Sequence, residues 1–350
     1  DKLSARANLD INATKFTLVK LNLLGELSQH NRPATEYSTL FPMIYDVPAA
    51  AFPVKTSTGV WGGDNVRKNP VAESVAKGFS VGNDRALYAD LRIIQDLSVL
   101  TSGLSAELAI AYDNRASYWD NKTKNYLYES LQPVRDNGGT IIDITRTRYG
   151  QETDLSFSSS LGYQNRVTTF EAKVNYEKNW QDMHQLNAAV IYHQEENSLK
   201  GINNTYRRQS YIGNASYAYK SKYLADLVLT YSGSSVLGSS DKYAFFPAVS
   251  AGWVISSEDF MKEVTAIDYL KARASWGITG SDRFAYDYDK YYFKTGISSY
   301  FLGDNNNSVS GNGEFRLPNL KLKPETAYKF NFGIDMEVFK RLSLSADVFY

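Results

Sequence analysis

The sequence predicts an all-β protein, an antiparallel β-barrel that spans a membrane. Three observations predict it: apolar and polar residues alternate along the chain, many of the strands are about ten residues long, and tight turns alternate with long connections. Residues 328–338 show the alternation most clearly, because every even position is apolar and every odd position is polar or glycine. A period of two belongs to a β-strand, whose successive side chains point to opposite faces.

Four other segments show the same alternation. They cover residues 3–12, 170–177, 270–279 and 342–350. About ten residues suffice for a tilted strand to cross a bilayer. A coarse count of the chain gives about 14 strands, more than one twisted open sheet holds without closing or splitting.

The polar face of these strands has full charges near strand centres. Examples are Lys271, Arg273, Lys329 and Asp335. Bulk water beside a soluble β-sandwich would solvate them, and so would the hydrated lumen of a large barrel. Alternation alone therefore leaves both architectures open.

The connections favour the barrel. Residues 13–15, 220–222 and 339–341 form tight turns, whereas 29–84 and 280–325 are long and rich in Gly, Asn, Pro and Ser. Threading the strands alternately puts the tight turns at one end and both long connections at the other. Outer-membrane barrels have this asymmetry, with short periplasmic turns and long extracellular loops. We expect one helical turn, at residues 257–262.

Composition excludes several classes of function. Lys plus Arg and Asp plus Glu both number 38, so the chain lacks the basic excess of a nucleic-acid-binding protein. It has no cysteine, which rules out disulfides and thiolate sites, and no apolar run long enough for a transmembrane helix. Aromatic residues reach 14%, with tyrosine the commonest, and such rings favour membrane interfaces. Strand-like patterns at both ends suggest a piece of a longer protein.

No motif predicts catalysis. The sequence contains no nucleophile elbow, P-loop or dinucleotide fingerprint. His193 precedes Glu195 and Glu196 at a spacing that a metal site can use, but a solvated strand end is the commoner explanation. The Asp-Asn-Asn-Asn stretch at 304–307 begins a segment that lacks the glycine and glutamate of a calcium loop, and we expect it to be a loop tip. We therefore expect no enzyme activity, no cofactor and no metal.

The long connections supply the candidate substrate-binding residues. Trp61, Asp64, Tyr300 and Asp304 place rings and carboxylates beside glycine-containing loops. Such rings can stack on sugar faces or peptide side chains. Packing within the loops themselves is the alternative, and the more common one.

Several ordered blocks resemble the SusC/RagA-like family of TonB-dependent outer-membrane transporters. They are Trp61–Gly63, Asn69–Ala72, Gly78–Phe79, Phe246–Met261, Leu270–Gly280, Leu322–Thr326, Phe332–Met336 and Arg341–Ser343. The resemblance covers essentially the whole chain. Two loop stretches depart from the family pattern: Ser232–Gly238 lacks an Asp and an Arg, and Thr279–Ser281 ends in Ser where Asn is usual. These departures affect what can be inferred about the substrate.

The resemblance implies that residues 1–350 are a segment of a 22-stranded outer-membrane barrel whose N-terminal plug and last strands lie outside this sequence. It implies import of oligosaccharides or peptides, energy from the TonB–ExbB–ExbD complex through the absent plug, and a SusD-like surface lipoprotein as partner. Outer-membrane lipid would surround the barrel, and no nucleic acid is involved. A passive porin or structural barrel is the runner-up, and a secreted β-sandwich adhesin is the third hypothesis.

Overall fold

Antiparallel strands dominate the structure, a computed structural model that describes residues 1–181, 183–199, 205–238, 240–283, 292–304 and 306–350. Part of the expected connection 280–325 therefore lies outside the described residues. Within the described ranges, none of the helices has both the length and the apolar character needed to cross a membrane.

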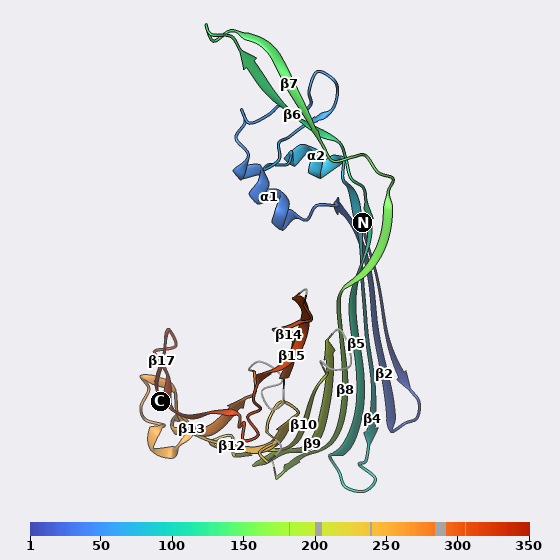
Figure 1. The fold of residues 1–350 in the computed structure, drawn as a ribbon. Coiled ribbons are helices and arrows are strands. Elements are labelled where there is room, and N and C mark those ends of the chain that lie inside the picture. The colour runs from blue at the N-terminus through green and yellow to red at the C-terminus, as the bar shows by residue number, and fades with distance from the viewer. Residues whose placement is uncertain (182, 200–204, 239, 284–291, 305) are drawn as a thin grey trace. The chain divides into compact units, whose positions relative to one another are not determined.

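Twelve strands form the main sheet in the order β1-β2-β4-β5-β8-β9-β10-β11-β12-β13-β16-β17 (Figure 1). Their bounds are β1 Lys2–Asn12, β2 Thr17–Pro33, β4 Gly78–Asp96, β5 Leu104–Thr123, β8 Ser156–Trp180, β9 His184–Leu199, β10 Thr205–Tyr219, β11 Tyr223–Ser234, β12 Tyr243–Val254, β13 Ile267–Ser281, β16 Glu325–Val338 and β17 Leu342–Phe349. The order starts at β1 and ends at β17, so the described sheet is open.

The remaining elements lie in the connections. They are α1 Tyr37–Asp46, β3 Trp61–Gly62, α2 Pro70–Val75, β6 Tyr128–Arg135, β7 Ile141–Tyr149, β14 Tyr292–Leu302, β15 Asn307–Arg316 and the 3₁₀ turns η2 Ile255–Ser257 and η3 Asp259–Met261. β3, β6 and β7 form one small sheet, and β14 and β15 form another. The two 3₁₀ turns fall where we expected a helical turn.

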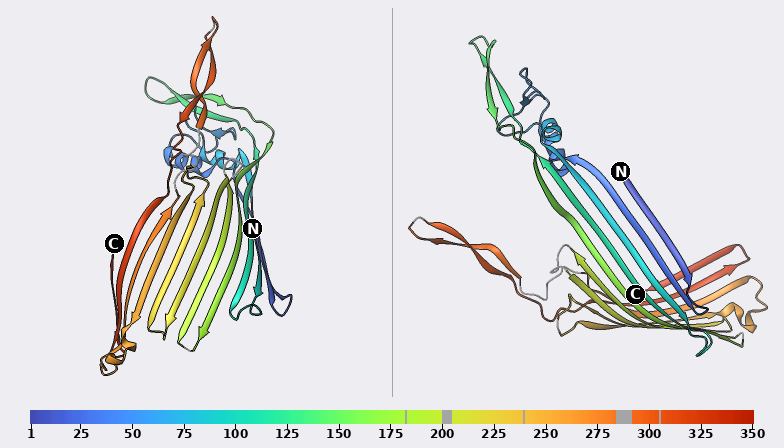
Figure 2. Two further views of the ribbon diagram at one scale, coloured as in Figure 1. Left: turned by 90° about the horizontal axis from the view of Figure 1, so that it is seen from below. Right: turned by 90° about the vertical axis from the view of Figure 1, so that its right-hand side faces the viewer.

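The chain divides into two compact units. Unit 1 comprises residues 1–6, 24–88 and 113–165, and unit 2 comprises residues 7–23, 89–112 and 166–350. Unit 1 contains both helices and the sheet of β3, β6 and β7, whereas unit 2 contains β9 to β17. In Figure 2 the strands β9 to β13 of unit 2 lie side by side and alternate in direction.

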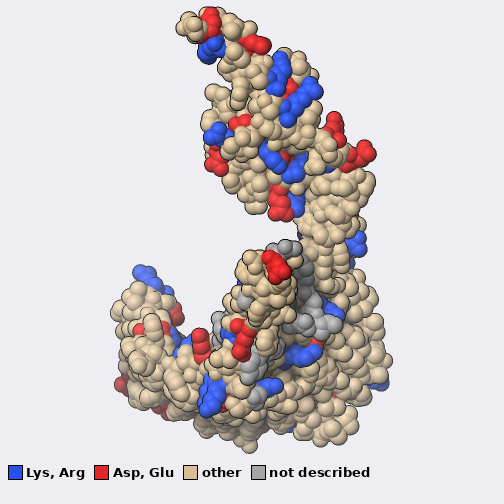
Figure 3. Space-filling model, viewed as in Figure 1, with Lys and Arg blue, Asp and Glu red and all other residues tan. Residues whose placement is uncertain are grey.

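Register sorts the side chains of unit 2 onto two faces. On β16, Phe330, Phe332 and Ile334 are 41–47% exposed on one face, which we call the outward face. On the other, interior face, Arg273 of β13 bonds to Asp335 of β16. In Figure 3 the hollowed side of unit 2 shows blue and red side chains, and its visible outer flank is largely tan. The predicted alternation therefore separates an apolar face from a charged one.

Two rows of aromatic side chains border the outward face of unit 2. The far row is Phe170, Tyr192, Tyr211, Tyr231 and Phe245, and the turn row is Trp180, His184, Tyr219, Tyr223 and Trp253. Along β11, Ala225, Leu227 and Leu229 separate the rows. Tyr231 follows Tyr223 by eight positions, a distance of about 26 Å at 3.3 Å per residue. Membrane barrels have an apolar band of about this height, flanked by aromatic girdles.

Connections differ from the expected boundaries because the strands run longer than the alternation suggested. The first long connection spans 34–77 instead of 29–84, and the last spans 282–324 instead of 280–325. A third long connection, 124–155, holds β6 and β7. The described residues thus form 17 strands, of which five lie in the two small sheets, compared with about 14 expected.

Neither α1 nor α2 was expected from the sequence. In α2, Pro70 occupies the first turn and the Asn69 side chain accepts hydrogen bonds from the backbone N–H groups of Val71 and Ala72, at 3.0 and 3.3 Å. Both are standard ways to start a helix. The short apolar stretch after Asn69 gave no helical period, so only the capping residues signalled this helix.

Candidate functional site

On the interior face, an arginine of β13 pairs with carboxylates of β16 and β17. Arg273 Nε lies 3.0 Å from Asp335 Oδ2, and Arg273 Nη1 lies 2.8 Å from Asp347 Oδ1. Ser345 donates a hydrogen bond of 2.7 Å to Asp335. The guanidinium therefore bridges two neighbouring strands.

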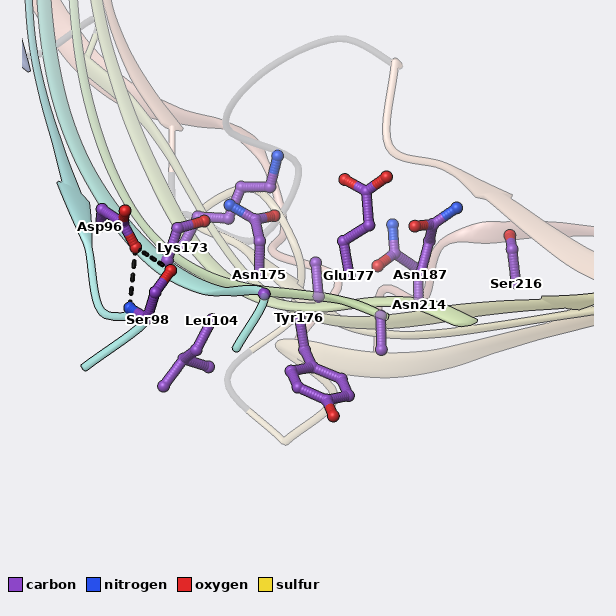
Figure 4. Close-up of a pocket in the computed structure, with 14 residues that line it drawn as sticks. Asp96, Ser98, Leu104, Lys173, Asn175, Tyr176, Glu177, Asn187, Asn214 and Ser216 are labelled. Atoms are coloured by element: carbon purple, nitrogen blue, oxygen red, sulfur yellow. Dashed lines mark hydrogen bonds between the residues drawn. The ribbon is translucent and has the colours of Figure 1, made fainter. Parts of the chain in front are cut away.

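The interior face of β8, β9 and β10 is different. There we define a polar shelf as Lys173, Asn175, Glu177, Asn187 and Asn214, which line a cavity of about 600 Å³. In Figure 4 all five project to the same side of the sheet, whereas Tyr176 and Leu104 project to the opposite side.

None of the five shelf side chains has a hydrogen bond or an ion pair to another side chain in the described part of the protein, so their donors and acceptors remain available. Amides and charged groups in this arrangement suit hydrogen bonding to a polar surface, a hydrated ligand or another protein segment.

A second interior cluster lies where β13 leaves the sheet. Arg208 Nη2 donates to Asp282 Oδ1 at 2.5 Å and to the Tyr206 hydroxyl at 2.8 Å, and that hydroxyl donates to Asp282. Burial opposes ionisation of Asp282, yet hydrogen bonds from Tyr206 and Ser234 and the charge of Arg208 hold its pKa below the usual range. The carboxylate fixes the first residue of connection 282–324 to the sheet.

The other end of that connection is fixed as well. Gly238 N–H donates to Leu322 O at 2.9 Å, and Lys323 Nζ lies 3.6 Å from Asp241 Oδ1. A Cβ on Gly238 would sit 2.2 Å from Leu320 O, so only glycine fits this approach. We call these contacts of Gly238 and Asp241 with residues 320–323 the clamp.

Two buried carboxylates organise the elements of unit 1. Glu73 of α2 accepts hydrogen bonds from Thr35 at 2.5 Å, Lys77 at 3.0 Å and Tyr126 at 3.0 Å. Burial opposes its ionisation, but these donors and the Lys77 charge keep its pKa below the ordinary value. Burial and the neighbouring Glu73 charge raise the pKa of Tyr126. Glu73 thus joins α2 to the ends of two main strands.

Glu129 plays the same part for the small sheet. Its Oε1 accepts from Thr56 at 2.5 Å and Thr58 at 2.7 Å, and Arg146 and Arg148 lie within 3.6 Å. The threonine hydroxyls, followed by the two arginine charges, hold its pKa below the usual range although burial opposes this. Both carboxylates accept hydrogen bonds from residues of unit 1, so their role is to hold the elements of unit 1 together.

Trp61 and Asp64 are tied to their own loop. Lys55 Nζ lies 4.5 Å from the centre of the Trp61 ring. Asp64 Oδ1 accepts hydrogen bonds from the backbone N–H groups of Val66 and Arg67, at 2.8 and 2.5 Å. Asp64 therefore closes a turn, and the Trp61 ring is already in contact with a cation.

Tyr300 and Asp304 lie on the hairpin of β14 and β15. Tyr300 pairs with Val309 and is 59% exposed, and Asp304 follows Gly303 in the tight turn. The structure thus brings Tyr300 and Asp304 into one hairpin and Trp61 and Asp64 into one turn. Neither pair belongs to the polar shelf, which sequence reasoning did not single out because its strands look like any other alternating segment.

His193 does not lie on the same face as both acidic residues that follow it. Its Nδ1 lies 3.3 Å from Glu171 Oε2 on the neighbouring strand. Register places Glu195 opposite Arg208, whereas Glu196 pairs with Arg207. The spacing that suggested a metal site thus distributes these side chains over both faces of β9.

A family model described as "TonB dependent receptor-like, beta-barrel" matches residues 29–350. TonB-dependent receptor P39 of Formosa agariphila is 33% identical over 297 residues, which cover 80% of this chain and 27% of that protein. TonB-dependent receptor SusC of Bacteroides thetaiotaomicron is 34% identical over 130 residues, which cover 36% of this chain and 13% of that protein.

A solved structure titled as the RagAB peptide importer in the closed-closed state superposes with a TM-score of 0.67 and 14% identity, over 99% of this chain and 39% of that one. At this identity the likeness concerns the fold. The chain spans between 13% and 36% of the length of the curated relatives that it matches.

Proposed function

The chain belongs to the TonB-dependent receptor-like β-barrel family, whose SusC-type members are outer-membrane barrels of Gram-negative bacteria, and we propose that the protein it belongs to imports nutrient oligomers across that membrane. The outward face of unit 2 contacts lipid between its two aromatic rows. The interior face lines the passage.

The polar shelf is the observation that carries this proposal. Five hydrogen-bonding side chains on three adjacent strands have no side-chain partner within the described residues. A wall that had only to close a barrel would pair such groups across strands, as Arg273 does with Asp335 and Asp347. These donors and acceptors are available to a ligand or to another protein segment that enters the barrel.

We propose that the energy for import comes through a plug domain and the TonB–ExbB–ExbD complex. Accumulation against a gradient requires an energy input, and the sequence has no nucleotide-binding motif. In this proposal the plug precedes residue 1 in the full-length protein, and a SusD-like lipoprotein covers the outer opening.

For the ligand we propose an oligosaccharide, with a peptide as the alternative. The amides of Asn175, Asn187 and Asn214 hydrogen-bond to sugar hydroxyls and to peptide groups alike. The candidates Trp61, Asp64, Tyr300 and Asp304 remain proposed outer contacts. Of these, Tyr300 is the most available, because its ring is 59% exposed.

The deciding experiment compares uptake at low external ligand concentration by the full-length protein and by a variant that lacks the TonB-interacting segment. Active import predicts that accumulation above the external concentration disappears in the variant. If accumulation persisted, the proposal would fail, and simple equilibration in both proteins would favour a passive porin.

A further inference from the structure

Two arginines lie on the outward face of unit 2 beyond the far aromatic row, and a lysine lines the same shallow cavity as one of them. We define the basic cluster as Arg166, Arg207 and Lys242. Arg207 Nε bonds to Glu196 Oε2 at 2.9 Å, and Arg166 Nη2 lies 3.9 Å from Glu196 Oε1. Two guanidinium groups from β8 and β10 therefore share one carboxylate of β9.

The cluster has an excess of positive charge. The Lys242 side chain has no ion pair in the described part of the protein, and with Arg207 it lines a shallow cavity of about 250 Å³. Arg166 and Arg207 remain 47% and 64% exposed despite their shared partner. Three cations beside one anion leave two positive charges unbalanced at this place.

The far aromatic row indicates how deep in the membrane the basic cluster lies. Arg207 precedes Tyr211 by four residues on the same face of β10, about 13 Å along the strand. The Tyr243 ring packs over Gly233 and donates its hydroxyl to Gln209, which lies between these two levels. Because aromatic rows mark the boundary of the hydrocarbon, the basic cluster reaches the layer of lipid headgroups.

At the opposite end of the same face, two lysines have carboxylate partners. Beyond the turn row, Lys222 lies 3.3 Å from Glu258 and Lys262 lies 2.7 Å from Asp259. Glu258 also accepts hydrogen bonds from Tyr223 and Trp253 of that row. Lys222 and Lys262 thus differ from Lys242, which has no ion pair among the described residues.

We propose that Arg166, Arg207 and Lys242 bind the phosphate groups of the anionic glycolipid in the outer leaflet of the outer membrane. Guanidinium groups match phosphate oxygens with two parallel hydrogen bonds, and basic residues near a membrane surface attract anionic lipids. The inference rests on the proposed orientation, in which the far row faces the outside, and it goes beyond import.

The test measures binding of purified bisphosphorylated lipid A to the full-length receptor in detergent, by native mass spectrometry. The triple variant Arg166→Ala, Arg207→Ala, Lys242→Ala is expected to bind at least about tenfold more weakly. The matched control replaces three exposed cations of the turn end, Lys15, Lys262 and Arg341, by alanine and should bind as the unchanged receptor does.

Two further measurements distinguish a loss of phosphate recognition from a loss of folding. Glu196→Gln removes the competing carboxylate, so it should strengthen binding, which an unfolded protein cannot do. Dephosphorylated lipid A should bind equally to the unchanged receptor and to the triple variant. Undiminished binding by the triple variant, or an equal loss with dephosphorylated lipid A, would overturn the proposal.

Weaker binding by the turn-end control, with unchanged binding by the triple variant, would also overturn the proposal. Uptake of the nutrient oligomer is measured separately in the same variants. Failure of lipid binding with intact uptake would contradict the lipid site alone, and loss of active uptake in the TonB-coupling variant would leave the lipid site untouched.

Discussion

At the scale of single residues, buried charge distinguishes the two units. In unit 1, Glu73 is 2% exposed at its side chain and takes three hydrogen bonds from side chains of other segments. Such a carboxylate is favourable only while its donors remain in place, because an unpaired buried charge is costly. Glu73 therefore reports whether α2 and its neighbours are correctly assembled.

Acid should loosen this assembly. The folded-state pKa of Glu73 lies below its value in an unfolded chain, so the carboxylate contributes stability above the unfolded pKa of about 4.5 and loses it as the pH falls through the lower folded pKa. Hydrogen exchange measured by mass spectrometry, corrected for intrinsic rates, should show α2 losing protection below about pH 4.5. Glu73→Gln should show reduced protection already at pH 7, whereas Glu152→Gln, an exposed control at 72%, should not. A Glu73→Gln variant with unchanged protection at both pH values would contradict the assignment.

The two faces of β16 should respond differently to a polar change. Phe332→Arg should cost about 2–4 kcal/mol of folding free energy near the bilayer midplane, because a charge enters hydrocarbon. Asp335→Asn should cost much less, since Arg273 keeps its contact with Asp347. Refolding titrations into bilayers compare the two variants, and similar losses for both would mean that the faces are wrongly assigned.

At the scale of elements, the strands were predictable and the small additions were not. Period two is a local signal, so β13, β16 and β17 follow from residues 270–279 and 328–350 alone. In α1, apolar residues recur at helical spacing, but Pro42 argues against a helix. The polar shelf could not be predicted, because absence of a partner depends on which strands are neighbours.

The clamp holds the C-terminal end of connection 282–324 against Gly238 and Asp241. A methyl group at Gly238 collides with the backbone of Leu320, so Gly238→Ala should detach residues 320–323 and speed their exchange and their cleavage by added protease. Gly213→Ala is the matched control, because nothing lies within 4 Å of a Cβ there. Equal protease sensitivity of the two variants would show that the clamp does not hold the connection.

At the scale of the whole molecule, one sheet combines a lipid-facing side, a charged interior and unequal ends. The short turns 220–222 and 339–341 join neighbouring strands at one end of unit 2, and connection 282–324 leaves the other. The polar shelf lies nearer the turns, because Asn187 and Asn214 are closer to residues 184 and 219 than to the far ends of β9 and β10. A segment bound there would occupy the inner part of the passage and leave the outer part open to ligand.

The orientation in the membrane follows from the same difference between the two ends of unit 2, which has short turns at one end and a long connection at the other. We expect connection 282–324 to lie outside the cell and the turns to lie in the periplasm, as short turns and long loops do in such barrels. Because residues 1–350 contain no cysteine, Asp304→Cys and Lys15→Cys each add one thiol to this segment at an exposed turn, and labelling is compared with that of the unchanged protein. On intact cells a membrane-impermeant maleimide should label Asp304→Cys and not Lys15→Cys, and disruption of the outer membrane should make both reactive. Labelling of Lys15→Cys alone on intact cells would reverse the orientation and move the proposed outer contacts, Tyr300 and Asp304, to the periplasmic side.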